Sequence, residues 1–355
     1  MKNIGIVQDP VFMEHRPGSY HPESPSRLFA AYELLKSEEI RSLFETLNAR
    51  MAKREEIQLI HTSGHFDRVA STEGFSTTYL DPDTVTSERS FEAALYAAGG
   101  VLEGIDRIMA GDFGEIFALV RPPGHHAESD RAKGFCLFNN IAIGAMYAIE
   151  NYGIERILIA DWDLHHGNGT QHSFYSDPRV LYFSTHQYPY YPGTGSFVEV
   201  GTGDGRGFTV NVPLGIGFGD YGYYLIYKTL LEPIAAAFRP QLVLVSAGFD
   251  TYYLDPLGGM EVTPVGFSAL AHLLHSIARS YADGRLLITL EGGYHIEGQA
   301  ESIGAIIKTL ANTTSSIQSG IQVGSAEKST DPGNRRIEAV IESVISIQKE
   351  FWNCF

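Results

Sequence analysis

Four apolar runs in the sequence are each followed at once by residues of the types that bind metals or transfer protons. The most specific spacing follows the run at 157–160, where Asp161, Asp163 and His165 alternate with Trp and Leu. If the chain stays extended there, alternate side chains point the same way, so these three share one face. Carboxylate and imidazole ligands suit Zn²⁺, and they are also compatible with Fe²⁺. Asp250 follows a different run and is a candidate to complete a three-ligand metal site.

The segments that follow the other two apolar runs, 116–120 and 286–290, supply groups that transfer or donate protons. His125 and His126 follow Pro-Pro-Gly, which favours a rigid turn from which both imidazoles can face one cleft. Histidine titrates nearest to neutral pH and is the most frequent general acid or base. Tyr294 follows Gly292 and Gly293, whose freedom allows a close approach of the backbone. Each feature alone has a purely structural explanation, but their recurrence after four apolar runs favours a catalytic site.

These segments need a scaffold that brings four strand ends together. Continuous apolar runs are typical of buried parallel strands, and segments of helical spacing alternate with them. In open α/β sheets, ligands bind beyond the carboxyl ends of the strands. The sequence therefore predicts one α/β domain with a parallel sheet. The predicted strands are 4–7, 116–120, 157–160, 208–212, 242–245 and 286–290, and the clearest helices are 91–109, 141–150 and 264–281, with Thr263 as the N-cap of the last.

The C-terminal segment 311–355 differs from the rest in composition. Its first part, 311–330, is rich in Ser, Thr, Gly and Gln, which indicates a polar linker. Apolar residues then recur at helical spacing from Ile337 to Phe351, which predicts a terminal helix that packs back onto the body. We therefore expect a catalytic domain at 1–310 and an appendage at 311–355.

The composition narrows the classes of partner. The chain has 355 residues, with 26 Lys and Arg against 42 Asp and Glu, giving a net charge of −16. This argues against direct nucleic-acid binding, although it would attract a cationic substrate. No apolar run approaches the ~18 residues of a membrane span, and no signal peptide is evident. Two cysteines cannot form a disulfide framework, so we expect a reducing, cytoplasmic location. The sequence leaves the oligomeric state open.

Taken together, the segments resemble the histone deacetylase superfamily. The resemblance covers roughly the first 310 residues. Asn168, where other members carry Asp, and the DPLGG string bring the chain closer to the class II side of the family. Bacterial acetylpolyamine amidohydrolases and deacetylase-like amidohydrolases share the same core. The motifs that carry the resemblance occur in the family's order: HPESPSRL (21–28), RPPGHHAE (121–128), GFCLFNN (134–140), DWDLHHGNG (161–169), YYPGTG (190–195), SAGFD (246–250), DPLGG (255–259) and LEGGY (290–294).

The resemblance implies a parallel sheet of about eight strands flanked by helices, and zinc-dependent hydrolysis of the N-acyl amide of acetyl-lysine. It also implies a role for each matching residue. A single Zn²⁺ would be held by Asp163, His165 and Asp250. The tandem histidines would be catalytic, with His126 the better candidate for general base and then acid, and with His125 more electrostatic. Asp161 would hydrogen-bond to His125, Asn168 would orient His126, and Tyr294 would polarise the scissile carbonyl.

The resemblance further implies a narrow tunnel for the acyl-lysine side chain and structural K⁺. The tunnel wall would include Gly134, Phe135, Tyr191, Leu257 and Gly292. Many relatives carry Phe where this chain has Tyr191. The K⁺ would be bound by backbone oxygens near four residues, Phe174, Asp177, Val180 and Ser184.

The sequence is also compatible with three functions other than acetyl-lysine deacetylation. An acetylpolyamine amidohydrolase is one, but Leu257 stands where polyamine-selective relatives can carry an acidic residue, which favours acyl-lysine. A binuclear hydrolase of the ureohydrolase type could recruit Asp161 and Asp255 to a second ion. A non-catalytic protein could grip acylated ligands through a retained metal site. The segment around His21, Glu23 and Arg27 is equally compatible with an entrance loop and with a structural salt-bridge cluster.

Overall fold

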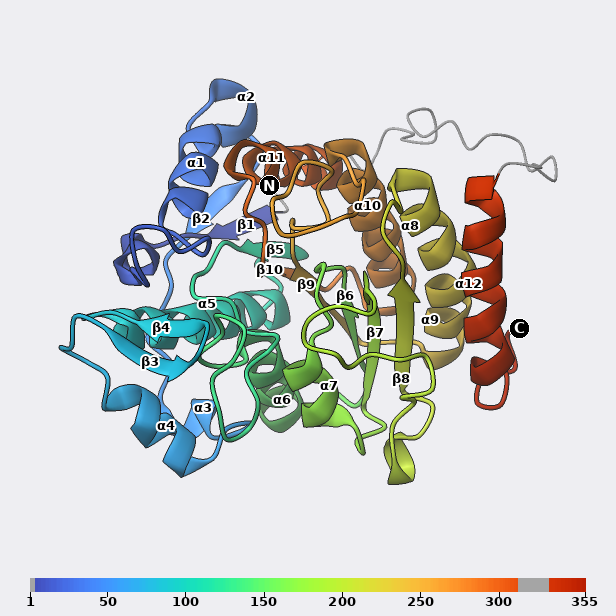
Figure 1. Ribbon diagram of the computed structural model, residues 1–355, viewed down its shortest axis with the longest axis horizontal. Coiled ribbons are helices and arrows are strands. Elements are labelled where there is room, and N and C mark those ends of the chain that lie inside the picture. Colours follow the sequence, from blue (N-terminus) through green and yellow to red (C-terminus); the bar gives the residue numbers. More distant parts are fainter. Residues whose placement is uncertain (1–3, 312–331) are drawn as a thin grey trace.

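An eight-stranded sheet forms the centre of the protein (Figure 1). The computed structural model describes residues 4–311 and 332–355. All neighbouring strands of this sheet are parallel, in the order β2-β1-β5-β10-β9-β6-β7-β8, which confirms the predicted fold class. The strands are β1 (Ile4–Val7), β2 (Glu45–Leu47), β5 (Glu115–Ala118), β6 (Ile157–Asp161), β7 (Val180–Gln187), β8 (Thr209–Leu214), β9 (Leu242–Ala247) and β10 (Leu286–Leu290).

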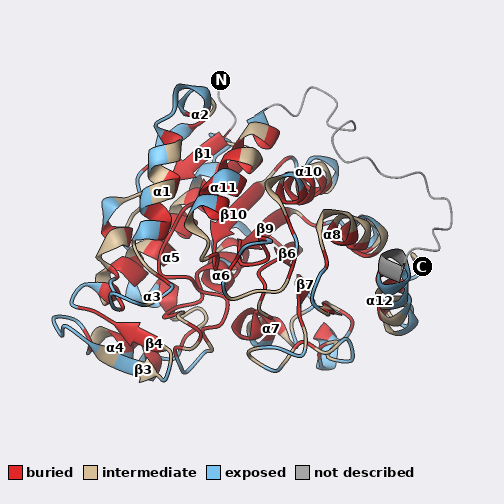
Figure 2. Cartoon of the chain, turned by 45° about the horizontal axis from the view of Figure 1, so that its top comes forward, coloured by how far each residue is buried: buried red, intermediate tan, exposed pale blue. Residues whose placement is uncertain are grey.

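Helices cover both faces of the sheet, which explains why its strands are continuous apolar runs. Every residue of β6, β9 and β10 is buried, and exposed residues lie mainly on the outer sides of the helices (Figure 2). α10 and α11 lie against one face, and α5, α6 and α7 lie against the other (Figure 1). The helices are α1 (Ser26–Leu35), α2 (Glu38–Arg41), α3 (Arg54–Ile57), α4 (Ser63–Ala70), α5 (Ser90–Met109), α6 (Asn140–Tyr152), α7 (Asn168–Phe174), α8 (Asp220–Ile226), α9 (Glu232–Phe238), α10 (Pro264–Tyr281), α11 (Ile296–Ala311) and α12 (Pro332–Gln348).

The boundaries of α10 and α6 have local causes, and the sequence predicts the start of α10. α10 begins at Pro264, and the side chain of Thr263 accepts a hydrogen bond from the backbone N–H of Val265 at 3.2 Å. α6 begins after Asn139, whose side chain caps it. It ends before Gly153, which adopts the left-handed conformation with φ 65°.

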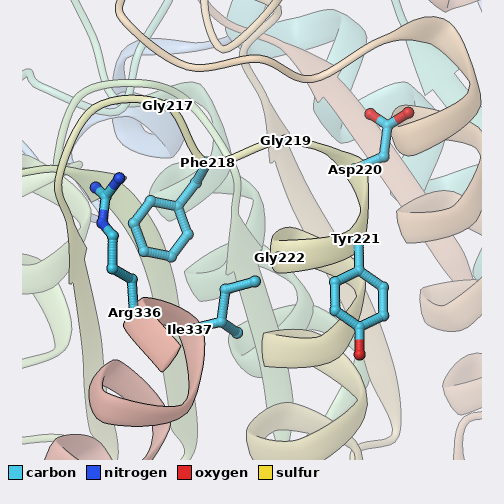
Figure 3. A pocket seen from close by; sticks show the side chains of 8 residues that line it. All are labelled: Gly217, Phe218, Gly219, Asp220, Tyr221, Gly222, Arg336 and Ile337. Carbon is cyan, nitrogen blue, oxygen red and sulfur yellow. The ribbon is translucent and has the colours of Figure 1, made fainter. Parts of the chain in front are cut away.

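The C-terminal helix α12 packs beside β8 and α8 (Figure 1). Gln348 donates a hydrogen bond to the backbone oxygen of Thr209 at 3.3 Å, and the indole N–H of Trp352 donates one to Gly207 O at 3.0 Å. At the other end of the helix, the guanidinium of Arg336 lies over the ring of Phe218, beside a surface pocket (Figure 3). The predicted linker lies outside the described residues, except for Ala311.

A two-stranded antiparallel hairpin, β3 (Thr78–Asp81) and β4 (Thr84–Thr86), stands apart from the main sheet. Its turn carries Asp83, which reaches the cavity described below. None of the described helices is long and apolar enough to cross a membrane.

Candidate active site

The four strands that precede the chemical segments are neighbours at the middle of the sheet. β5, β10, β9 and β6 lie side by side, and their registers align Asp161 with Ser246, Ser246 with Thr289, and Thr289 with Ala118. The segments that leave their carboxyl ends therefore start at the same level of one side of the sheet. This topology brings residues near positions 125, 163, 250 and 294 together.

Asp163, His165 and Asp250 form a compact set of donors. Their ligand atoms all lie within 4.8 Å of one another, and they are the only such group of His, Cys, Asp or Glu within 4–311 and 332–355. Nδ1 of His165 is 3.2 Å from Oδ1 of Asp163 and 3.1 Å from Oδ2 of Asp250. A Cβ at Gly292 would lie 2.4 Å from Oδ2 of Asp250, so only glycine leaves this side of the cluster open. The donors fit a divalent metal such as Zn²⁺ in type and spacing.

The electrostatics of this cluster also favour a cation. Burial lowers the pKa of His165, but its hydrogen bonds to the carboxylates of Asp163 and Asp250 raise it to about 9. Burial and the charge of Asp163 raise the pKa of Asp250 to about 7. Two buried carboxylates this close repel each other unless a positive charge lies between them. A divalent ion would supply that charge.

The tandem histidines lie against the cluster with different partners. Nδ1 of His125 is 3.1 Å from Oδ2 of Asp161, and Nδ1 of His126 is 2.7 Å from Oδ1 of Asn168. Burial lowers the pKa of His125, but Asp163 and Asp161 raise it to about 10. Burial and the neighbouring His125 hold the pKa of His126 well below its ordinary value. These shifts favour the charged form of His125 and the neutral form of His126.

Tyr294 faces the same cavity as the two histidines. Its backbone N–H donates to Oδ2 of Asp255 at 2.6 Å, and the guanidinium of Arg27 lies 5.1 Å from its ring centroid. Burial raises the pKa of Tyr294 well above the usual value for a phenol. The hydroxyl group therefore stays protonated and can donate a hydrogen bond to an oxygen in the cavity.

The cavity is a narrow slot of about 90 Å³. All five predicted wall residues line it, together with His125, His126, His165 and Tyr294. Three further residues also line the slot, Asp83, Pro123 and Cys136. The Asp-Pro-Asp turn signal at 81–83 indicates a hairpin, but nothing local predicts that this hairpin reaches the slot.

Glu291 has a positioning role that the sequence analysis did not assign. Its Oε2 accepts hydrogen bonds from the backbone N–H groups of Gly124 at 2.6 Å and His125 at 3.2 Å. Its Oε1 accepts one from the hydroxyl of Ser246 at 3.0 Å. Glu291 thus ties the histidine turn to the ends of β9 and β10.

The segment near residues 21–27 combines the two roles that the sequence left open. The ring of His21 packs edge-on against Phe135 of the slot wall, at 4.6 Å between centroids. Glu23 and Arg27 are instead completely buried and form an ion cluster with Arg121. Arg27 also donates hydrogen bonds to the backbone oxygens of Glu291 and Gly293, so this cluster supports the segment that carries Tyr294.

Glu23→Gln is expected to lower the free energy of unfolding by ~3–5 kcal/mol, because two buried guanidinium groups lose their charge partner. Burial would raise the pKa of Glu23, but Arg121 and a hydrogen bond from His15 bring it well below the ordinary value. The stabilisation by ionised Glu23 is therefore complete above its unfolded pKa of ~4.3, and it is lost as the pH falls through the lower pKa that Glu23 has in the folded protein. Urea unfolding at pH 7 and below pH 4 measures both effects. The control is Glu33→Gln, which removes a half-exposed partner of Lys36; equal losses in the two variants would contradict the prediction.

The two residues considered for a second metal ion are engaged elsewhere. Both oxygens of Asp255 accept hydrogen bonds from backbone N–H groups, those of Leu257, Tyr294 and His295. Asp161 accepts from Tyr182 at 2.9 Å and contacts His125. This arrangement does not favour the binuclear alternative.

The four residues considered for K⁺ do not lie at one place. Phe174 ends α7, and Asp177 precedes Val180, the first residue of β7. Ser184 is four residues further along this strand, ~13 Å away at ~3.3 Å per residue, and its hydroxyl is 2.9 Å from Nδ1 of His186. Any ion near the first three would therefore be separate from one near Ser184.

Comparison with known proteins gives the family. A family model described as "Histone deacetylase domain" matches residues 21–310. The chain belongs to the histone deacetylase family. It is thus a member of a family of deacetylases, which are hydrolases that act on amide C–N bonds. The match ends at α11, so α12 lies beyond it.

Several relatives show the range of this family. A probable deacetylase of Archaeoglobus fulgidus is 36% identical, with 99% of each chain covered. Histone deacetylase 15 of Arabidopsis thaliana is 40% identical over 94% of this chain, and the human polyamine deacetylase HDAC10 is 40% identical over 81%. The chain spans 59% and 44% of the lengths of these two proteins. The crystal structure of the HDA15 HD domain superposes with a TM-score of 0.88 at 37% identity, covering 99% of this chain and 95% of that one.

Proposed function

We propose that the protein hydrolyses the N-acyl amide of acetyl-lysine in a peptide or protein, with a single Zn²⁺ held by Asp163, His165 and Asp250. The observation that carries this proposal is that one narrow slot is lined by His165 of the three-ligand cluster, by the tandem histidines and by Tyr294. These are the groups that metal-assisted amide hydrolysis requires: a metal site, a general base and an oxyanion donor.

Each group of the chain has a stated task in this proposal. When bound, Zn²⁺ would lower the pKa of a coordinated water toward ~7 and polarise the acyl oxygen. His126 takes the proton of the attacking water at Nε2 and passes it to the leaving amine. His125, charged through Asp161, stabilises negative charge next to it. Tyr294 donates a hydrogen bond to the oxygen that was the acyl carbonyl.

The wall of the slot supports an acyl-lysine substrate. Phe135 and Tyr191 are aromatic, and Leu257 adds an apolar side chain, so the slot suits a chain of methylene groups. Leu257 offers no charge for a distal amine, which supports acetyl-lysine over an acetylpolyamine. Asp83 stands at the hairpin turn and can accept a hydrogen bond from a donor of the substrate.

Turnover assays on an acetyl-lysine peptide and on an acetylpolyamine, before and after removal of the metal, test the proposal. We expect faster turnover of the peptide, loss of activity on chelation and recovery on adding Zn²⁺. Elemental analysis should find about one transition metal per chain, because the donors form a single three-ligand set. Adding Fe²⁺ in parallel compares the two metals, and the same analysis measures K⁺.

Each opposite outcome removes one part of the proposal. Full activity of the metal-free protein would end the metal mechanism. Two transition metals per chain would favour the ureohydrolase type, and preference for the polyamine would replace the substrate. No turnover of either compound would favour a binding protein.

A further inference from the structure

Asn168 connects the slot to a carboxylate outside it. Its Oδ1 is 2.7 Å from Nδ1 of His126, and its Nδ2 is 2.5 Å from Oε1 of Glu128. The same carboxylate contacts His172, whose Nδ1 is 2.9 Å from Oε2 and whose side chain is half exposed. A continuous chain of polar groups thus runs from the slot to the surface.

An asparagine amide can face a histidine in two ways. Its oxygen and its NH₂ group are nearly equal in shape, so rotation by 180° exchanges an acceptor for a donor. The NH₂ group of Asn168 reaches the backbone oxygen of His126 only at 3.3 Å, whereas it lies 2.5 Å from the carboxylate of Glu128. The partner on the other side of Asn168 therefore determines which atom the imidazole meets.

Glu128 is a partner that permits only one orientation. Burial would raise its pKa, but hydrogen bonds from His172 and Asn168 bring it below the ordinary value, so it is ionised at neutral pH. An ionised carboxylate accepts hydrogen bonds and donates none. The NH₂ group of Asn168 must then face Glu128, and its oxygen must face Nδ1 of His126.

This orientation fixes the tautomer of the imidazole. Because the amide oxygen accepts only, Nδ1 of His126 carries the hydrogen, and Nε2 keeps its free lone pair. We propose that Glu128 is a positioning residue that, by orienting Asn168, makes Nε2 of His126 the proton-accepting nitrogen. The inference rests on the proposed function, in which His126 is the general base.

The variant Glu128→Gln tests this role. A glutamine can accept or donate, so Asn168 can rotate and present its NH₂ group to His126, which places the hydrogen on Nε2. Loss of such an orienting group typically costs ~10–100-fold in activity. We expect a fall of this size in kcat with KM unchanged, because the substrate contacts stay in place. Asp130→Asn is the matched control, since it removes a carboxylate two residues away whose side chain is 65% exposed.

A second substitution separates orientation from a merely structural effect. In Asn168→Asp, both side-chain oxygens are hydrogen-bond acceptors, so an acceptor always faces Nδ1 of His126. Adding Asn168→Asp to Glu128→Gln should therefore restore most of the lost kcat. Alone, Asn168→Asp should lower kcat, because its carboxylate would lie against that of Glu128 and the two would repel. Full kcat in Glu128→Gln, or a double variant no faster than Glu128→Gln, would overturn the inference.

The tautomer of His126 can also be measured directly, which tests the inference without any substrate. Nitrogen-15 NMR of the zinc-reconstituted protein should show an unprotonated Nε2 for His126 in the parent and a mixture in Glu128→Gln, with the signal assigned from a His126→Ala sample. An unchanged Nε2 signal in the variant would contradict the role of Glu128. If the parent shows the expected tautomer but does not hydrolyse acetyl-lysine, the proposed function fails while the orientation argument stands.

Discussion

Replacing Tyr294 by phenylalanine is expected to lower kcat on an acetyl-lysine peptide by ~10²–10³-fold, the usual cost of losing one oxyanion donor. The phenol lines the slot beside both histidines, and its raised pKa keeps it protonated. The hydrogen bond strengthens as charge develops on the acyl oxygen, so KM should change little. Steady-state kinetics of the zinc-loaded protein measure both constants.

A matched tyrosine controls for the loss of a hydroxyl group. Tyr221 lies on α8 and lines the pocket beside α12 rather than the slot (Figure 3). Tyr221→Phe should therefore retain the parent kcat. Near-normal turnover in Tyr294→Phe would remove this phenol from the mechanism and leave the metal and the histidines to act without it.

Asp250→Asn is expected to abolish both metal binding and turnover. The change keeps the shape of the side chain but removes one of the two charges that face His165. A catalytic metal supplies several kcal/mol of transition-state stabilisation, so a fall of ~10³-fold or more follows at 1.36 kcal/mol per tenfold. Zinc content by elemental analysis should fall from about one per chain toward zero, given three protein ligands per site.

The stability of the metal-free protein separates ligand loss from misfolding. Burial and Asp163 raise the pKa of Asp250 to about 7. Stability is therefore lost as the pH rises from the unfolded pKa of ~3.9 to the folded pKa of about 7, and the loss is complete above it. At pH 8 the metal-free Asn variant should unfold at the same temperature as the parent or higher. The control is Asp283→Asn, whose side chain is 83% exposed and distant from the cluster in sequence. Retained zinc in Asp250→Asn would contradict its role as a ligand.

The centre of the sheet and the pair Asp163 and His165 were predictable because both depend on local patterns. Strands β1, β5, β6, β9 and β10 are continuous apolar runs, and alternation along the chain after β6 is enough to place Asp163 beside His165. β2 has only three residues, two of them exposed, so it carries no such signal. In β7, the buried second half is polar, Ser-Thr-His-Gln, which hides a strand from an analysis of apolar runs.

The supporting residues were not predictable, because their partners are distant in sequence. Glu291 accepts a hydrogen bond from Gly124, which is 167 positions away in the sequence, and Glu128 accepts one from Asn168, which is 40 positions away. Asp83 reaches the slot from a hairpin outside the main sheet. Their side-chain types are common on protein surfaces, and only the tertiary arrangement gives them a role at the site.

The position of α12 has a consequence for where the chain can be cut. The family match ends at residue 310, yet Thr209 O and Gly207 O at the outer side of β8 are satisfied by Gln348 and Trp352. A protein ended at residue 310 would expose these acceptors along an edge strand. Such an edge is a template for pairing with other molecules, so the trimmed protein would be prone to self-association. We therefore expect the C-terminal helix to limit self-association by covering this edge.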